Sequence, residues 1–280
     1  MKKANNKNDF LVSDLPRNRY QLFFDILKNQ WRNLLLLAVI ITMIFSPIIL
    51  LRYFNLIMIN SLVSDSNVND NLGNQIFNYT AAYNFINFFL IVVAGILLGG
   101  VCRIYKKLAY NEGFFLGADL IQGIKENFKD FIKLFVVFGI VTSLIDTLSV
   151  NYRIENNSLY LFFEILNDGI VLPILGVSMS LCCIYADTFR AKINASCKIY
   201  FKYLPKIVLL LLILLFPLLF LLINSSIAQL LVPFIYVAIY FPIAYLIVVL
   251  VLNSIFDKGI NEKNFPDLVG KGMYHDNNID

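Results

Sequence analysis

The sequence predicts an all-α membrane protein, a polytopic bundle of six transmembrane helices. Of its 280 residues, 59% are hydrophobic and only 15% are charged, and the mean hydropathy is +0.71. A soluble globular domain carries about 25% charged residues. Aliphatic runs such as IVLLLLILLFPLLFLLI do not alternate as the strands of a barrel would. The spans should therefore be helices, which satisfy their backbone groups internally in lipid.

Six segments are long and apolar enough to cross about 30 Å of hydrocarbon, which takes about 20 helical residues. The predicted spans are residues 34–54, 85–104, 131–150, 166–186, 205–224 and 231–252. They form one membrane domain, residues 33–256, which lies between an N-terminal segment of residues 1–32 and a C-terminal tail of residues 257–280. On one side of the membrane a long polar loop, residues 55–84, is expected.

The positive charges predict the orientation. Of the 23 Lys and Arg residues, 21 fall on the side that holds both termini, and only Arg52 and Arg153 fall on the other. Loops rich in Lys and Arg stay in the cytoplasm. The abundance of Asn, Ile and Lys is typical of an AT-rich bacterial genome. We therefore expect a multi-pass protein of a bacterial plasma membrane with both termini in the cytoplasm.

A basic and aromatic heptad occurs three times, as KNQWRNL at residues 28–34, KENFKDF at 125–131 and KIYFKYL at 198–204. Each heptad precedes an outward-going span, so the six spans are predicted to be three repeated hairpins. Amphipathic cytoplasmic helices are expected before the first, third and fifth spans. The side chains expected to contact lipid or a partner, called the heptad residues below, are Lys28, Trp31, Arg32, Lys125, Phe128, Lys129, Lys198, Phe201 and Lys202.

Two interpretations of the heptads remain open. Basic stems and aromatic rings at headgroup depth anchor a protein to anionic phospholipid. The same residues could instead form a docking surface for another protein. Spacing does not distinguish the two, because the two charges of each heptad lie four residues apart on one helical face in either case.

Acidic side chains near membrane depth are the candidate intramembrane site. Asp146 lies near the outer end of the third span, and Glu164 and Asp168 open the fourth. Antiparallel packing of these two spans should bring Asp146 and Asp168 to similar depth. Clustered carboxylates can hold a proton or a cation, although water reaches this depth near the outer interface.

Small and helix-breaking residues indicate how the spans pack. Gly95, Gly99 and Gly100 give the second span a G-x-x-x-G face, which favours close contact with another helix. Proline residues within the spans free backbone carbonyl groups, and neighbouring helices must then satisfy them. The prolines concerned are Pro47, Pro173, Pro217, Pro233 and Pro242.

No motif in the sequence indicates an enzyme, a cofactor or a metal site. There is no phosphate-binding glycine loop, no G-x-S-x-G and no H-E-x-x-H. The one His is His275, and the cysteines form no C-x-x-C pair. Disulfides are not expected on the cytoplasmic side, where the four cysteines fall.

The stretch GVCRIYKKLAYNEGFFLGADLIQGIKENFKDFIKLF resembles the YesL-like family of small bacterial membrane proteins. The similarity rests on an Asn111-Glu112 turn followed by an F-x-x-G-x-K-x-N-F-K-type helix, with Leu120 at its first position. Its remaining matched residues are Gly123, Lys125, Asn127, Phe128 and Lys129. The resemblance covers most of residues 20–272, from which the long outer loop and the tails depart. The resemblance implies an association with carbohydrate ABC importers. It identifies no functional residue in this sequence.

The leading hypothesis is a non-enzymatic accessory or assembly factor of a bacterial membrane complex, such as a carbohydrate ABC importer. The alternative is a small transporter or channel that uses the acidic residues of the third and fourth spans. The expected partners are the lipid bilayer, anionic phospholipid headgroups and importer permease subunits. No nucleic-acid partner is expected.

Overall fold

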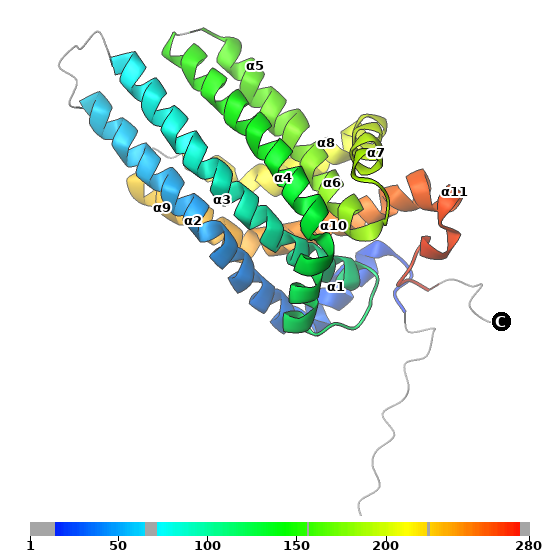
Figure 1. The fold of residues 1–280 in the computed structure, drawn as a ribbon. Helices are drawn as coiled ribbons and strands as arrows, with labels where there is room; N and C mark the ends of the chain where they lie inside the picture. Colours follow the sequence, from blue (N-terminus) through cyan, green and yellow to red (C-terminus); the bar gives the residue numbers. More distant parts are fainter. Residues whose placement is uncertain (1–14, 65–71, 156, 223–224, 275–280) are drawn as a thin grey trace, which may run out of the picture.

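The protein is almost entirely helical in the part of the chain that the computed structural model describes, residues 15–64, 72–155, 157–222 and 225–274 (Figure 1). No β-strand occurs among these residues. Six helical segments in them are long and apolar enough to cross a membrane. The segments are Trp31–Val63, Leu72–Ala109, Leu116–Ile154, Leu159–Ile184, Leu204–Leu221 and Ser226–Asn264. The predicted all-α class with six candidate spans is confirmed.

The helices are numbered in chain order. The α-helices are α1 (Arg19–Asn29), α2 (Trp31–Ser64), α3 (Leu72–Ala109), α4 (Leu116–Ile154), α5 (Leu159–Leu166), α6 (Leu172–Ile184), α7 (Phe189–Lys202), α8 (Leu204–Leu215), α9 (Ser226–Ile235), α10 (Phe241–Phe256) and α11 (Glu262–Asn264). The π-helices are η2 (Asn167–Val171), η4 (Tyr236–Tyr240) and η5 (Asp257–Asn261). The 3₁₀ helices are η3 (Phe216–Leu222) and η6 (Pro266–Leu268).

The first three spans are longer than predicted. Helices α2, α3 and α4 contain 34, 38 and 39 residues, and 34 helical residues extend about 51 Å. The predicted loop over residues 55–84 is wrong in its described part, because α2 continues to Ser64 and α3 begins at Leu72. Residues 65–71 lie outside the described chain. The prediction ended each span where hydropathy falls, whereas a helix needs only its backbone hydrogen bonds to continue.

The segments before the odd-numbered spans differ from one another. Helices α1 and α7 are separate from the spans that follow them, and Pro205 opens α8 at a position where its missing N–H costs no hydrogen bond. No separate helix precedes the third span. There α4 is continuous from Leu116 to Ile154, because no proline interrupts it.

The helices pack in two layers (Figure 1). Helices α2, α3, α4 and α5 lie side by side, and α8, α9 and α10 lie behind them. Helix α10 contacts α2, α3, α6 and α8 and so holds the layers together. The core at this junction is completely buried at Tyr105, Phe131 and Leu246.

Helices α3 and α4 make the most extensive contact of the fold, and glycines permit it. A Cβ atom on Gly100 would lie 2.5 Å from the Leu120 carbonyl oxygen, and a Cβ atom on Gly123 would lie 2.9 Å from the Gly100 Cα atom. The carbonyl of Gly99 accepts a hydrogen bond from the Asn127 side chain at 3.1 Å. The glycine face of the second span therefore packs against another helix of the same chain. The two helices in contact, α3 and α4, belong to different hairpins of the predicted repeat.

Tyrosine hydroxyls satisfy two backbone carbonyls that prolines leave without a helical partner. Pro173 has no N–H to donate to the carbonyl four residues earlier, that of Gly169, which instead accepts from the Tyr200 hydroxyl at 2.6 Å. In the same way the Ile213 carbonyl, four residues before Pro217, accepts from the Tyr240 hydroxyl at 2.5 Å. The expectation that neighbouring helices satisfy these groups is confirmed at both positions.

Candidate functional site

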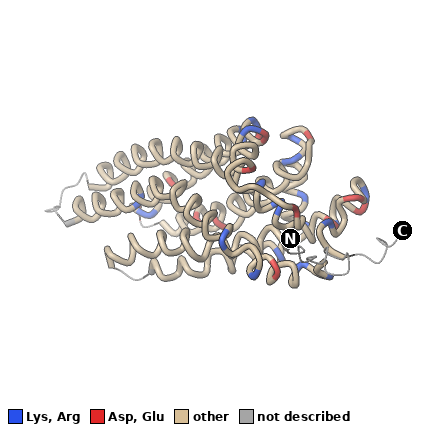
Figure 2. Tube along the Cα trace, turned by 90° about the horizontal axis from the view of Figure 1, so that it is seen from below, with Lys and Arg blue, Asp and Glu red and all other residues tan. Residues whose placement is uncertain are grey.

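Charged residues gather at one end of the bundle (Figure 2). The two ends of the described chain also meet there, because the Tyr274 N–H donates to the Pro16 carbonyl at 3.0 Å. We call this the terminal end, and the opposite end the far end. The terminal end carries most of the ion pairs of the described residues, so it is the first place to look for a functional surface.

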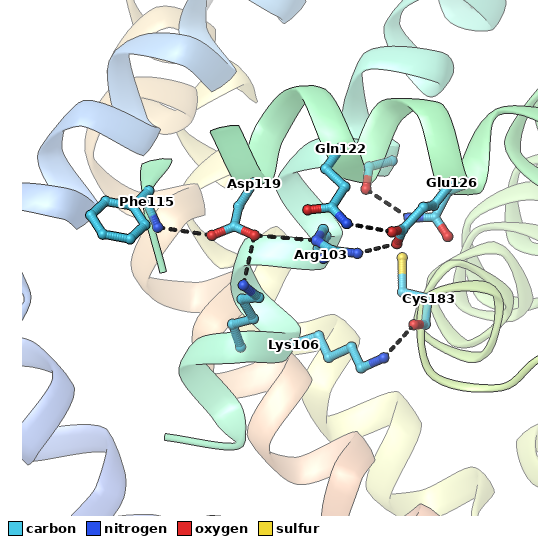
Figure 3. Close-up of polar contacts among 10 residues, drawn as sticks. Arg103, Lys106, Phe115, Asp119, Gln122, Glu126 and Cys183 are labelled. Carbon is cyan, nitrogen blue, oxygen red and sulfur yellow. Dashed lines mark hydrogen bonds and ion pairs between the residues drawn. The ribbon is translucent and has the colours of Figure 1, made fainter. Parts of the chain in front are cut away.

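A buried carboxylate, Asp119, organises the contact between α3 and α4 at the terminal end (Figure 3). Its Oδ1 atom accepts from Lys107 Nζ at 2.6 Å and from Arg103 Nε at 3.4 Å, and its Oδ2 atom accepts from the Phe115 N–H at 2.8 Å. Glu126 also pairs with Arg103. Asp119 is 5% exposed. A buried carboxylate is tolerated only when it is paired and hydrogen-bonded, and Asp119 meets both conditions.

Two lysines fasten this pair of helices to α6 and α7. Lys106 Nζ donates to the Cys183 carbonyl at 2.9 Å (Figure 3). Lys192, which is 5% exposed, donates to Asp130 Oδ2 at 2.6 Å. Each of these cations is therefore neutralised or hydrogen-bonded within the protein.

A second buried network holds the C-terminal residues against the bundle. Arg19 Nη2 lies 3.1 Å from Asp257 Oδ2, and Asp257 Oδ1 accepts from Asn261 Nδ2 at 2.8 Å. Asn261 Oδ1 in turn accepts from the Tyr185 hydroxyl at 2.6 Å. Burial raises the pKa of Tyr185 above its ordinary value, so this hydroxyl stays protonated and remains a donor.

The predicted C-terminal tail begins inside a helix. Its described part, residues 257–274, continues α10 through η5 and then packs on the turn between α3 and α4. Lys271 pairs with Glu112 at 2.7 Å and lies over the Tyr110 ring at 5.1 Å. A Cβ atom on Gly272 would lie 2.5 Å from the Tyr110 carbonyl, and φ there is +85°. A residue with a side chain would be strained at this position.

The nine heptad residues are all exposed. Their aromatic members Trp31, Phe128 and Phe201 are 52%, 45% and 65% exposed. Among the described residues, none of the six heptad cations has a carboxylate within ion-pair distance. Arg32 lies 5.6 Å from the centre of the Trp31 ring, on the same heptad. The heptads thus present uncompensated positive charge next to aromatic surface.

The three predicted acidic residues lie at the far end, and the structure separates their roles. One side chain, Asn167, approaches both Asp146 and Asp168, with its Nδ2 atom 3.5 Å from Asp146 Oδ1 and 3.4 Å from Asp168 Oδ1. Glu164 pairs instead with Arg153. The Oδ1 atom of Asn167 is buried and has no partner among the described residues. The structure therefore brings Asp146 and Asp168 to one side chain, while Glu164 forms an ion pair with Arg153.

Sequence reasoning missed the residues that build the two terminal networks. The sequence patterns assign no role to Asp119, and they include Lys192 and Arg19 only among the 21 positive charges on one side. A signal for Asp119 exists, because it lies four residues after Phe115 and can cap the start of α4. No local signal pairs Arg19 with Asp257, which lies 238 residues away.

The cysteines carry free thiols at all four positions, Cys102, Cys182, Cys183 and Cys197. Within the described residues, His, Cys, Asp and Glu side chains form no group of three that could hold a metal ion. His275 lies outside those residues. Comparison of the chain with family models, with curated proteins and with solved structures found no match.

Proposed function

We propose that this protein is a non-enzymatic accessory or assembly factor of a bacterial membrane complex, such as a carbohydrate ABC importer. It docks through its three heptads. One observation carries the proposal: the six heptad cations are exposed and have no carboxylate partner among the described residues.

The contrast with other cations of the chain supports this assignment. Arg19, Arg103, Lys107, Lys192 and Lys271 all pair with carboxylates of the protein. The ion pairs that these five cations form stabilise the folded chain, and this explains their positions. The heptad cations have no such explanation, and charge complementarity to a partner gives them one, because it steers association and fixes the register of an interface.

The proposal includes an orientation and a repeat. The terminal end faces the cytoplasm of a bacterial cell, and the six spans act as three hairpins, each opened by a heptad. Amphipathic helices at the membrane surface present the heptads to permease subunits, and the outermost cations also contact anionic phospholipid headgroups.

The test is affinity purification of the full chain, tagged at its C-terminus, from its own host at native level and in mild detergent. The variant replaces Lys125, Lys129, Lys198 and Lys202 by Gln. The matched control replaces four exposed cations outside the heptads by Gln, and these are Arg190, Lys206, Lys258 and Lys263.

We expect permease subunits to be recovered with the wild-type chain and with the control, and to be lost with the heptad variant. Recovery of the protein alone contradicts the proposal. So does a heptad variant that keeps the permease subunits but loses bound phosphatidylglycerol, since the heptads would then be lipid anchors only.

A second function, a small transporter or channel, is favoured by the approach of Asp146 and Asp168 to the single side chain of Asn167. In this proposal the two carboxylates hold a proton or a cation at the far end. Liposome flux should then fall when both become Asn, and it should persist in the control Glu164→Gln. Flux that survives the double substitution excludes this function.

A further inference from the structure

A cavity of about 410 Å³ opens at the terminal end, between the end of α6, the start of α7 and the C-terminal segment. Its floor is apolar and is formed by Leu181, Ile184, Ile260 and Leu268. This volume lies within the range of small-molecule sites, about 300–1,000 Å³. None of the heptad residues lines it.

Small side chains on α7 leave the space open. Ala191 and Ala195 are four residues apart, so they lie on one face of the helix, and both line the cavity. Larger residues at these two positions would fill the space from that wall. The cavity is therefore a consequence of residue choice along α7.

The charges on the cavity wall do not cancel. Lys192 lines the cavity, but its ammonium is already paired with Asp130 at 2.6 Å. Asp187 also lines it, is exposed, and pairs with no cation among the described residues. Its Oδ1 atom accepts only from the neighbouring Thr188 N–H, at 2.6 Å. One unneutralised carboxylate thus borders a cavity whose lining is mostly apolar.

Two aromatic rings also line the cavity. Tyr185 and Phe265 both line it, with ring centres 5.4 Å apart and planes inclined by 39°. The hydrogen bond from the Tyr185 hydroxyl to Asn261 fixes the orientation of its ring. Aromatic faces attract cations, and a carboxylate beside them strengthens the attraction for ammonium groups.

We infer that this cavity is a binding site for an ammonium group carried on an apolar body. The ammonium contacts Asp187 and the rings of Tyr185 and Phe265, and the apolar body lies against the alanine wall and the aliphatic floor. Two sources provide this chemistry, an aminophospholipid headgroup and a free alkyl amine. The inference does not depend on the proposed docking function, because it uses none of the heptad residues.

The first test measures binding of n-octylammonium to the purified full chain in nanodiscs of phosphatidylglycerol, by thermal shift and by calorimetry. Octanol and octanoate have the same chain without the cation, and we expect only the ammonium to stabilise the protein in a saturable way. Asp187→Asn should weaken binding by about tenfold or more, as for the loss of one charged contact. The control Asp267→Asn removes an exposed carboxylate of the C-terminal segment that does not line the cavity. This variant should bind octylammonium as the wild type does.

A second variant, Ala191→Leu, fills the cavity and should also abolish binding. Should that variant fail to fold, Asp187→Asn still decides, because Asp187 is on the surface. Equal binding of octanol and octylammonium, or binding that Asp187→Asn leaves unchanged, overturns the site.

The source is distinguished by native mass spectrometry after release from nanodiscs of mixed phosphatidylethanolamine and phosphatidylglycerol. Phosphatidylethanolamine that stays on the wild type and leaves Asp187→Asn identifies the lipid headgroup. Octylammonium binding without retained phosphatidylethanolamine identifies a free amine. Failure of both probes overturns the inference.

Discussion

The Tyr200 hydroxyl donates to the Gly169 carbonyl at 2.6 Å. Pro173, four residues further along the chain, has no N–H to donate to this carbonyl. Replacing Tyr200 by Phe leaves this carbonyl without its hydrogen-bond donor inside the bundle. An unsatisfied buried polar group costs about 1–3 kcal/mol, so Tyr200→Phe should lower the free energy of unfolding by that amount. Equilibrium unfolding in micelles measures it. The control Tyr20→Phe removes a hydroxyl from a side chain that is 72% exposed and should have little effect.

The crossing of α3 and α4 should not tolerate a methyl group at Gly123. The added Cβ would lie 2.9 Å from Gly100 Cα and 2.8 Å from Arg103 Cβ. Overpacking of this kind costs about 1–3 kcal/mol. The same substitution at Gly117, in the same helix, meets no atom within 4 Å and should be neutral or stabilising. Unfolding measurements that rank the two variants in the opposite order would contradict the close packing.

The two acids that pair with Arg103 should differ in their contribution to stability. Asp119 has a side chain 7% exposed, and its removal leaves Lys107 and Arg103 without their buried partner. Asp119→Ala should therefore cost about 3–5 kcal/mol. The Glu126 side chain is 49% exposed, and Glu126→Ala should cost about 0–1 kcal/mol. Similar losses for the two variants, measured by the same unfolding assay, would show that Asp119 is not the centre of the network.

Alkaline pH should loosen the contact between the C-terminal segment and the α3–α4 turn. Burial raises the pKa of Tyr110 from 10.0 to about 12. Between these values the unfolded chain loses the proton and the folded protein keeps it, so stability falls as pH rises from about 10 to about 12. The free energy of unfolding of the wild type should fall relative to that of Tyr110→Phe over this window. A constant difference between the two proteins would exclude Tyr110 as the titrating group.

Much of the membrane architecture could be predicted from local patterns. Six apolar runs, the glycine face at Gly95, Gly99 and Gly100, and the need to satisfy carbonyls near Pro173 and Pro217 all depend on residues close in the sequence. The span ends could not be predicted in the same way. Hydropathy falls at Arg52, yet the backbone of α2 hydrogen-bonds to itself as far as Ser64.

The candidate site was predictable only in part. Exposure of the heptad residues and the approach of Asp146 to Asp168 agree with expectations from spacing. The third acid, Glu164, shares that spacing but pairs with Arg153. Its partner is decided by the packing of α5 on α4, which no period in the sequence encodes.

By itself the sequence determined the helical class, the six candidate spans and the positions of the heptads, because bilayer thickness and helix geometry act on residues that are neighbours in the chain. Only the tertiary structure decided which charges are neutralised. Arg19 and Asp257 meet because α1 packs on α10, and Lys192 meets Asp130 because α7 packs on α6, which in turn contacts α4. The charges left unpaired, on the heptads and at Asp187, are known only once those distant pairs have formed, since electrostatic pairing depends on distance in space.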